Sequence, residues 1–308
     1  MHNHELAALL QRLGAGPPID LGDLAVVPLL AADLSVEADL LAESLARGTT
    51  EVAEVDEKGD VNRVVVRHHG RWPLLLIDGE ELIGAKQNRV LNASFLVAPG
   101  SAVVVPVSCV EQGRWRRRSA SFDAAERTLA SPERTAKLRR VTTSVTTTGR
   151  HDADQGQVWR DVNATLQRHS VRSSTQAYAD VVAARAGDIE RRVDALAPID
   201  GQVGLATVAG DRLLAADLLG SPSLYRRGWR KLARGLVAEV GPPSRSPRAA
   251  AVVLEALAQA ARIPYTRASG TGMGETLHGM GGHAVSGLVT GAVVSGGAVY
   301  HAVIGGAM

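Results

Sequence analysis

The chain has 308 residues, of which 45% are apolar and 21% are charged, and its formal net charge is +2. This composition is typical of globular proteins and excludes a chain that stays disordered. The net charge is too small to indicate nucleic-acid binding, and aromatic residues are only 3% of the chain, so the aromatic and basic interleaving of single-strand binders is almost absent.

The first part of the chain shows short helix and strand patterns. Leucines at helical spacing predict an amphipathic helix near the N-terminus, which is followed by a proline-containing connector, and together they occupy residues 1–23. Residues 24–30 have the pattern of a first strand. Ser35 is a favourable N-cap, and we expect it to precede a helix over residues 38–46.

From residue 50 to about 118 the pattern changes to β. Strand-like runs are separated by turns that contain Gly or Pro, and they cover 50–55, 61–68, 73–77, 90–97 and 102–110. Sequential antiparallel strands predict a sandwich or a barrel-like unit.

The second half of the chain is more mixed. Residues 122–156 are rich in Ser, Thr, Arg and Asp, which predicts a polar connector or mobile loop that contributes little to the core. The later elements that we expect are helical segments over 157–196, a hairpin over 203–218, helices over 224–240 and 248–262, a glycine-dense loop over 269–282 and a terminal hairpin over 285–304 that docks on an existing sheet.

These elements predict an α+β fold, with an antiparallel β-sandwich or barrel-like sheet and flanking helices. We expect one domain over 24–308, with a β-rich part at 24–121, the polar connector at 122–156 and an α/β part at 157–308. No apolar run is long enough for a membrane span, and no signal peptide is evident. The single cysteine agrees with a reducing compartment, so we expect a cytoplasmic protein that does not use membranes.

A dense polar run, Gly79 to Arg89, carries two carboxylates, a lysine, two amides and an arginine. Such side chains can orient an anionic substrate while a partly buried glutamate acts as general base. The alternative is a surface hairpin in which Glu80 and Glu81 form exposed ion pairs with Lys86 and Arg89.

A second polar run, Ser108 to Trp115, ends the strand that is predicted over 102–110. Cys109 and Glu111 share a face if that strand continues, so a thiol and a carboxylate would project together. A nucleophilic thiol needs a nearby cation or imidazole, and the alternative is a small buried hydrophobic residue. Arg114 and Trp115 are suited to hold a planar or anionic ligand.

Metal and cofactor signals are weak. The metal-ligand candidates are Glu275, His278, His283 and His301, whose spacing matches no zinc signature, so we expect no metal site. Walker, dinucleotide and Gly-x-Ser-x-Gly patterns are all missing, and the sequence leaves any cofactor unknown.

Both polar runs resemble the hallmark motifs of the ARG and rhodanese-phosphatase-superfamily-associated protein domain family, where ARG stands for ADP-ribosylglycohydrolase. Weaker similarity at 154–159, 174–175, 201–204 and His301 extends the resemblance to about residues 24–304. Because the family is named for its association with enzymes linked to ADP-ribose and NAD, the resemblance implies a role near ADP-ribose or a related phosphorylated nucleoside.

The resemblance also implies a set of site residues. The catalytic candidates are Glu80, Glu81, Cys109 and Glu111; the ligand-binding candidates are Lys86, Gln87, Asn88, Arg89, Gln112, Arg114 and Trp115, with Gln157, Trp159 and His301 as a second tier. In the leading hypothesis the cations hold phosphate, the amides fix polar groups, and Glu81 or Glu111 acts as acid or base.

The alternative function is a non-catalytic ligand-binding or accessory module linked to NAD and ADP-ribose metabolism, and the sequence leaves open whether the protein is an enzyme. Arg116 to Arg118 depart from the family pattern and add positive charge. We expect a small anionic ligand as partner and no nucleic acid, while the oligomeric state stays open. Both hypotheses require that the two polar runs meet in space around a common hollow.

Overall fold

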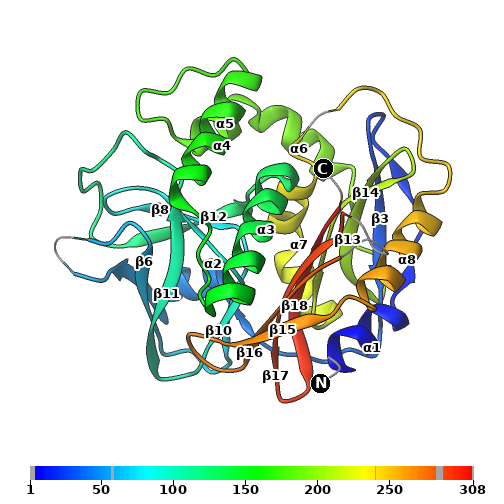
Figure 1. Cartoon of the computed structure of the whole chain (residues 1–308), viewed down its shortest axis with the longest axis horizontal. Coiled ribbons are helices and arrows are strands. Elements are labelled where there is room, and N and C mark those ends of the chain that lie inside the picture. Colours follow the sequence, from blue (N-terminus) through cyan, green and yellow to red (C-terminus); the bar gives the residue numbers. More distant parts are fainter. Residues whose placement is uncertain (1–3, 57–58, 240, 282–286, 307–308) are drawn as a thin grey trace.

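The computed structural model describes residues 4–56, 59–239, 241–281 and 287–306. The fold is α+β, with mainly antiparallel sheets covered and separated by helices (Figure 1). No helix in these ranges is both long and apolar enough to cross a membrane.

The largest sheet has the strand order β1-β3-β13-β14-β18-β17-β16-β15, with β2 pairing β3, and all of its pairs are antiparallel. Its strands are β1 (Gly14–Ala15), β2 (Ile19–Asp20), β3 (Ala25–Leu30), β13 (Gln202–Ala209), β14 (Arg212–Leu219), β15 (Tyr265–Ser269), β16 (Glu275–Met280), β17 (Val289–Ser295) and β18 (Ala298–Gly305). Both predicted hairpins are present as β13-β14 and β17-β18, and the terminal hairpin docks on β14 as expected.

A six-stranded sheet in the order β12-β8-β9-β11-β6-β5 forms the other half of the molecule. Its strands are β5 (Thr50–Glu54), β6 (Arg63–His68), β8 (Glu80–Gly84), β9 (Arg89–Leu91), β11 (Ser101–Cys109) and β12 (Phe122–Thr128). A three-stranded sheet, β10-β7-β4, accompanies it and consists of β4 (Asp39–Leu40), β7 (Leu74–Leu76) and β10 (Phe95–Val97).

The helix expected over residues 38–46 is shorter than predicted. Asp39 and Leu40 pair in parallel with β7 instead, and the helix α2 (Leu41–Ala46) begins after them. Its N-cap is Leu40 and not Ser35, because the backbone of residues 39–40 is already committed to the sheet.

Helices divide the molecule into layers (Figure 1). The helices are α1 (His4–Arg12), α3 (Ser131–Thr148), α4 (Gln155–Arg168), α5 (Tyr178–Ala184), α6 (Ala186–Asp194), α7 (Pro222–Leu236) and α8 (Ala249–Ala260). Helices α1 and α8 pack on one face of the large sheet, whereas α3 and α7 pack on its other face. Helix α7 also contacts β12, and α3 shares the apolar core of the six-stranded sheet with α4 and α5.

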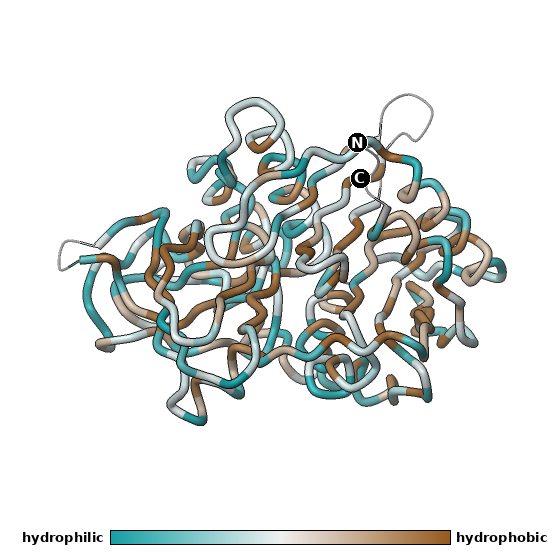
Figure 2. The backbone as a smooth tube through the Cα atoms, turned by 90° about the horizontal axis from the view of Figure 1, so that it is seen from below, coloured by the Kyte–Doolittle hydropathy of each residue, from teal (hydrophilic) through white to brown (hydrophobic). Residues whose placement is uncertain are grey.

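The apolar cores follow these layers. One core lies between α1, α8 and the large sheet, a second lies within the six-stranded sheet, and a third lies around α7. Figure 2 shows hydrophobic stretches of backbone running through the interior of both halves, with hydrophilic stretches toward the outside.

The prediction that residues 122–156 form a polar connector is wrong, because they form β12 and all of α3. Helix α3 has no simple apolar stripe, and its buried face includes Arg134 and Lys137, whose charges are neutralised by carboxylates from other segments. Hydroxyl groups near its end donate to carbonyl oxygens one turn earlier, as Thr147 does to Thr143. These contacts are invisible to a search for apolar periodicity.

The glycine-dense loop expected over 269–282 is also wrong, since β16 occupies much of it and pairs with both β15 and β17. Gly279 lies under the ring of Tyr265, and a Cβ atom there would come within 2.7 Å of that ring. Glycine in this strand therefore permits close packing and does not interrupt the sheet.

Candidate functional site

The two polar runs converge at one end of the six-stranded sheet. Strand β9 pairs with β8 on one side and with the end of β11 on the other, so Arg89 lies opposite Cys109. The turn between β8 and β9 is held against the second run, because the Val110 amide donates to the Asn88 carbonyl at 3.1 Å. The turn begins with Ala85 in the left-handed region, at φ 40°.

Glu111 is the centre of the junction. Its carboxylate accepts hydrogen bonds from Arg114 at 2.6 and 2.8 Å, from the Asn88 backbone amide at 3.1 Å and from the Thr175 hydroxyl at 3.0 Å. Burial raises the pKa of Glu111, but the bonds from Arg114, Asn88 and Thr175 outweigh it and hold the pKa below its ordinary value. This carboxylate is thus ionised and fixed in place.

Arg114 ties the two runs together. Its guanidinium also donates to the carbonyl oxygens of Ala85 and Gly84 and to the Asn88 side chain. Gln87 adds a further link, because its amide donates to the Glu111 carbonyl at 3.0 Å. The exposed Gln112 contributes only its carbonyl, which accepts from Gln87 at 3.4 Å.

Arg89 is completely buried beside Cys109. Its guanidinium donates to the Gln87 side chain at 2.9 Å and lies under the Trp115 ring, 5.8 Å from the ring centroid. The Lys86 ammonium lies 5.3 Å from the same centroid, and the ring itself is 50% exposed. Trp115 therefore covers two cations of the first run, which is a cation–π arrangement.

Cys109 has the surroundings of a structural thiol. It is fully buried, and burial raises its pKa although Arg89 and Trp159 oppose that shift. A reactive cysteine needs a lowered pKa and access to solvent, and Cys109 has neither. The geometry thus gives no support to the expectation of nucleophilic catalysis.

The two neighbouring glutamates of the first run point to opposite faces of β8, as the period of a strand requires. Glu80 forms an ion pair with Lys231 of α7 and accepts from the Ile77 amide at 3.3 Å. Glu81 pairs with Arg127 of β12 at 2.6 Å and accepts from the Asn88 side chain at 3.3 Å. Both are buried, which contradicts the alternative of an exposed hairpin.

The environment of Glu81 is perturbed. Burial raises the pKa of this fully buried carboxyl, while Arg127 and Asn88 lower it, and the net shift is upward. Asn88 and Arg127 line the adjacent cavity described below, whereas Glu81 itself does not line it. The group with the raised pKa is therefore next to the cavity but screened from it.

A cavity of about 430 Å³ opens at the junction, and we name it the arginine pocket. Its lining includes Asn88, Glu111, Arg114, Arg116, Arg117, Arg118, Ser174, Thr175 and Asp180. A second cavity of about 470 Å³, the α5–α6 pocket, is lined by Ile83, Arg127, Tyr178, Val182, Ala183 and Ile189 among others. The two pockets share Asn88, Arg118 and Ala179, so they are direct neighbours.

Three second-tier residues lie away from these pockets. The Gln157 side chain bonds to Arg160 and Asp161 along α4. Trp159 packs beside Cys109. His301 is fully buried between Ser94 and Asp217, inside the cluster described next.

A buried ion cluster joins the two halves of the protein. Arg134 of α3 donates to Asp78 at 2.8 Å and to both oxygens of Asp217 at 2.5 and 2.9 Å. Lys137 pairs with Asp78 at 2.7 Å, and His301 contacts Asp217 at 3.0 Å. The sequence patterns did not indicate this cluster, because its members come from four separate segments.

Sequence reasoning also missed three supporting residues of the site. The Gln155 amide bonds to both the amide and the carbonyl of Cys109, at 2.7 and 2.9 Å, and so holds the end of β11. Arg127 pairs with Glu81, and Thr175 with Glu111. The weaker motifs at 154–159 and 174–175 are the signals that contain two of them.

Among the described residues, no group of three or more His, Cys, Asp or Glu side chains is placed to hold a metal ion. His283, one of the metal-ligand candidates, lies outside the described residues. His278 is buried next to His151, with 5.2 Å between the ring centroids.

Comparison with known proteins gives one match. The model of the ARG and Rhodanese-Phosphatase-superfamily-associated Protein domain matches residues 12–304. No curated protein and no solved structure matches the chain.

Proposed function

The chain belongs to the ARG and Rhodanese-Phosphatase-superfamily-associated Protein domain family, and from this premise we propose that it binds an ADP-ribose-like phosphorylated nucleoside in the arginine pocket and the adjoining α5–α6 pocket. The observation that carries the proposal is a pair of free cations. The side chains of Arg116 and Arg118 line the arginine pocket and make no hydrogen bond or ion pair with any other described residue. Guanidinium groups bind phosphate oxygens with two parallel hydrogen bonds, and these two are available to do so.

The floor of the arginine pocket is rigid, which favours binding. Asn88, Glu111 and Arg114 are fixed to one another and to the backbone of both polar runs. A preorganised floor lowers the conformational entropy that the protein must lose on binding. Ser174 and Asp180 add a hydroxyl and a carboxylate to the wall, and such groups recognise sugar hydroxyls.

The α5–α6 pocket suits the less polar part of such a ligand. Tyr178, Val182, Ala183 and Ile189 supply apolar surface beside the shared residue Asn88. A phosphate bound in the arginine pocket would therefore place an attached nucleoside next to this apolar surface. Apolar side chains are the usual lining of a small-molecule site.

The placement of the carboxylates supports binding without turnover. Glu111 lines the arginine pocket, but the hydrogen bonds from Arg114 keep its carboxylate ionised and already engaged. Glu81 has the raised pKa that a general acid needs, yet it lies behind Arg127 and Asn88. We therefore propose a ligand-binding or accessory module linked to ADP-ribose metabolism, with Cys109 and Glu80 serving the fold.

Calorimetric titration with ADP-ribose tests the proposal. We expect saturable binding that adenosine, which has no phosphate, does not displace. Replacing Arg116, Arg117 and Arg118 with glutamine removes at least two charge-assisted contacts of about 1.5 kcal/mol each, which weakens binding about 100-fold. A measurable product after prolonged incubation with ADP-ribose or NAD would overturn the absence of turnover.

A matched control removes the same charge elsewhere. Arg12, Arg226 and Arg248 lie in exposed ion pairs, and their replacement by glutamine also lowers the net charge by three. This variant should bind ADP-ribose within about twofold of the original chain, because exposed pairs contribute little and general attraction is screened. Equal losses in the two triple variants, or no binding of ADP-ribose at all, would contradict the assignment of the site.

A further inference from the structure

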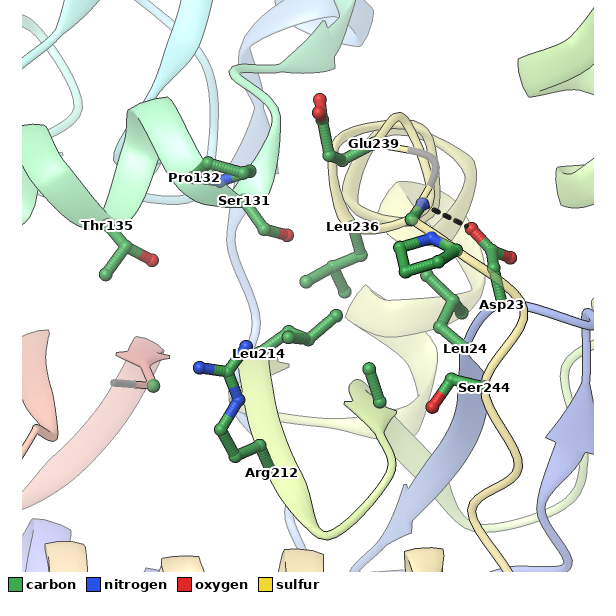
Figure 3. A pocket seen from close by; sticks show the side chains of 14 residues that line it. Asp23, Leu24, Ser131, Pro132, Thr135, Arg212, Leu214, Leu236, Glu239 and Ser244 are labelled. Carbon is green, nitrogen blue, oxygen red and sulfur yellow. Dashed lines mark hydrogen bonds between the residues drawn. The ribbon is translucent and has the colours of Figure 1, made fainter. Parts of the chain in front are cut away.

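A third cavity lies outside the proposed site and shares no lining residue with the other two pockets. It has a volume of about 490 Å³ and lies between the N-terminus of α3, the end of α7 and strand β14, so we name it the α3 pocket (Figure 3). It is well separated in sequence from both polar runs, because its lining residues come from 23–24, 131–135, 209–214, 236–244 and Gly306.

The walls of the α3 pocket are largely hydrocarbon. Leu24, Leu214 and Leu236 line it together with Pro132 and Pro242. Figure 3 shows the Leu214 and Leu236 side chains directed into the space from two different elements. Burying an apolar body against such walls is favourable at about 25 cal/mol per Å².

One end of the pocket carries an unsatisfied hydrogen-bonding group. The Ser131 hydroxyl is buried without any hydrogen-bond partner, and Figure 3 shows its oxygen directed into the pocket. Ser131 is the first residue of α3, an 18-residue helix whose N-cap, Ala130, provides no side-chain bond. Buried hydroxyls without a partner are rare, and helix N-termini attract negative charge, so two independent features indicate an anionic or acceptor group here.

The free charge around the pocket is positive. Arg212 lines it and makes no ion pair or side-chain hydrogen bond with any described residue. The two acidic residues of the lining are already neutralised: Asp23 pairs with Arg192, and Glu239 pairs with Arg168 at 3.1 Å. An acidic head group would thus meet one available cation and no unpaired carboxylate from this lining.

We propose that the α3 pocket binds a small amphipathic carboxylate. The carboxylate accepts a hydrogen bond from the Ser131 hydroxyl at the N-terminus of α3 and pairs with Arg212, while the hydrocarbon body lies between Leu214 and Leu236. A single hydroxyl and a single cation match the one charge of a carboxylate. The proposal is independent of the ADP-ribose site, because neither pocket of that site contributes to this one.

The test is a titration of the full chain with octanoate, followed by calorimetry or ligand-observed NMR. We expect a dissociation constant below about 1 mM, as for an efficient ligand of this size. Octylamine and 1-octanol have the same tail and should bind at least about tenfold more weakly, because their heads lack the negative charge. Equal binding of octanol and octanoate, or no saturation by about 10 mM, would overturn the proposal.

Variants locate the site. Ser131→Ala and Arg212→Gln should each weaken octanoate binding about tenfold, and Leu214→Trp should abolish it by filling the pocket. Arg116→Gln in the arginine pocket is the control and should leave octanoate binding unchanged. If Leu214→Trp does not fold, the other two variants still test the site, because both should fold. Ser131→Ala removes a buried hydroxyl that has no hydrogen-bond partner, and Arg212→Gln alters an exposed side chain. Unchanged binding in both of them would refute the assignment.

Discussion

The substitution Asp217→Asn tests the buried ion cluster. Asp217 is fully buried and accepts two hydrogen bonds from Arg134 and one from His301. Burial raises the pKa of Asp217, but Arg134 and His301 outweigh burial and hold the pKa below its ordinary value. Asparagine keeps the shape and removes the charge, so two cations, Arg134 and Lys137, would then share the single carboxylate of Asp78.

The expected cost follows from this charge imbalance. Two carboxylates balance two cations in the intact cluster, and removing one partner of a buried pair typically costs about 3–5 kcal/mol. At about 2 °C per kcal/mol for a chain of this size, Asp217→Asn should lower the melting temperature by about 6–10 °C. Asp161→Asn is the matched control: its partner Arg140 lies 2.7 Å away at a partly exposed position, so the loss should stay within about 1 kcal/mol.

Guanidinium denaturation gives the free energy of unfolding, and a double-mutant cycle with Arg134→Met isolates the coupling. The double variant leaves only Asp78 with Lys137, which is again neutral, so its loss should be smaller than the sum of the two single losses. A loss for Asp217→Asn as small as that of the control, or strictly additive losses, would refute the role of charge balance in this interior.

Two further predictions concern buried titratable groups. Burial lowers the pKa of His278 to about 3 and that of His151 to about 4, so both stay neutral in the fold while the unfolded chain takes up protons as the pH falls through 6.5. The free energy of unfolding should therefore fall by about 3 kcal/mol from pH 6.5 to pH 5, and His278→Leu should remove about half of that loss in denaturation experiments at the two pH values. Parallel pH profiles of the variant and the original chain would contradict this assignment. Cys109, buried and with a raised pKa, should resist iodoacetamide at pH 8 in the native protein and react after denaturation; rapid native labelling, followed by mass spectrometry, would show instead that the thiol is accessible.

The sequence predicted elements well where apolar residues set the pattern. The alternating runs at 203–208 and 213–218 form the hairpin β13-β14, and the terminal hairpin docks as expected. The prediction of α3 failed because this helix buries charged side chains. Arg134 and Lys137 pair there with carboxylates from distant segments, which no local sequence pattern reveals. Apolar periodicity carries no information about ion pairs between segments that are far apart in the chain.

The convergence of the two polar runs was the required geometry, and the structure shows it through the contacts of Asn88 with Glu111 and Arg114. The roles of individual residues were harder to infer. The alternation of side chains along a strand predicts that Glu80 and Glu81 lie on opposite faces of β8. Only the fold shows that Glu80 forms an ion pair with Lys231 and that Glu81 forms one with Arg127. His301 was grouped with the site by motif, whereas it lies in the ion cluster because β18 pairs with β14 beside Asp217.

The order in which the ribosome releases the chain gives the ion cluster a second significance. Asp78 precedes Arg134 by 56 residues, and Asp217 follows it by 83. A nascent chain that ends before β13 therefore holds two cations for one carboxylate, and β3 still lacks its neighbour β13. Closing the interior at that moment would bury an unbalanced charge, so early collapse is disfavoured until the C-terminal strands emerge. The charge balance of this cluster thus favours closure of the interior only after the strands that follow α3 in the chain have been synthesised.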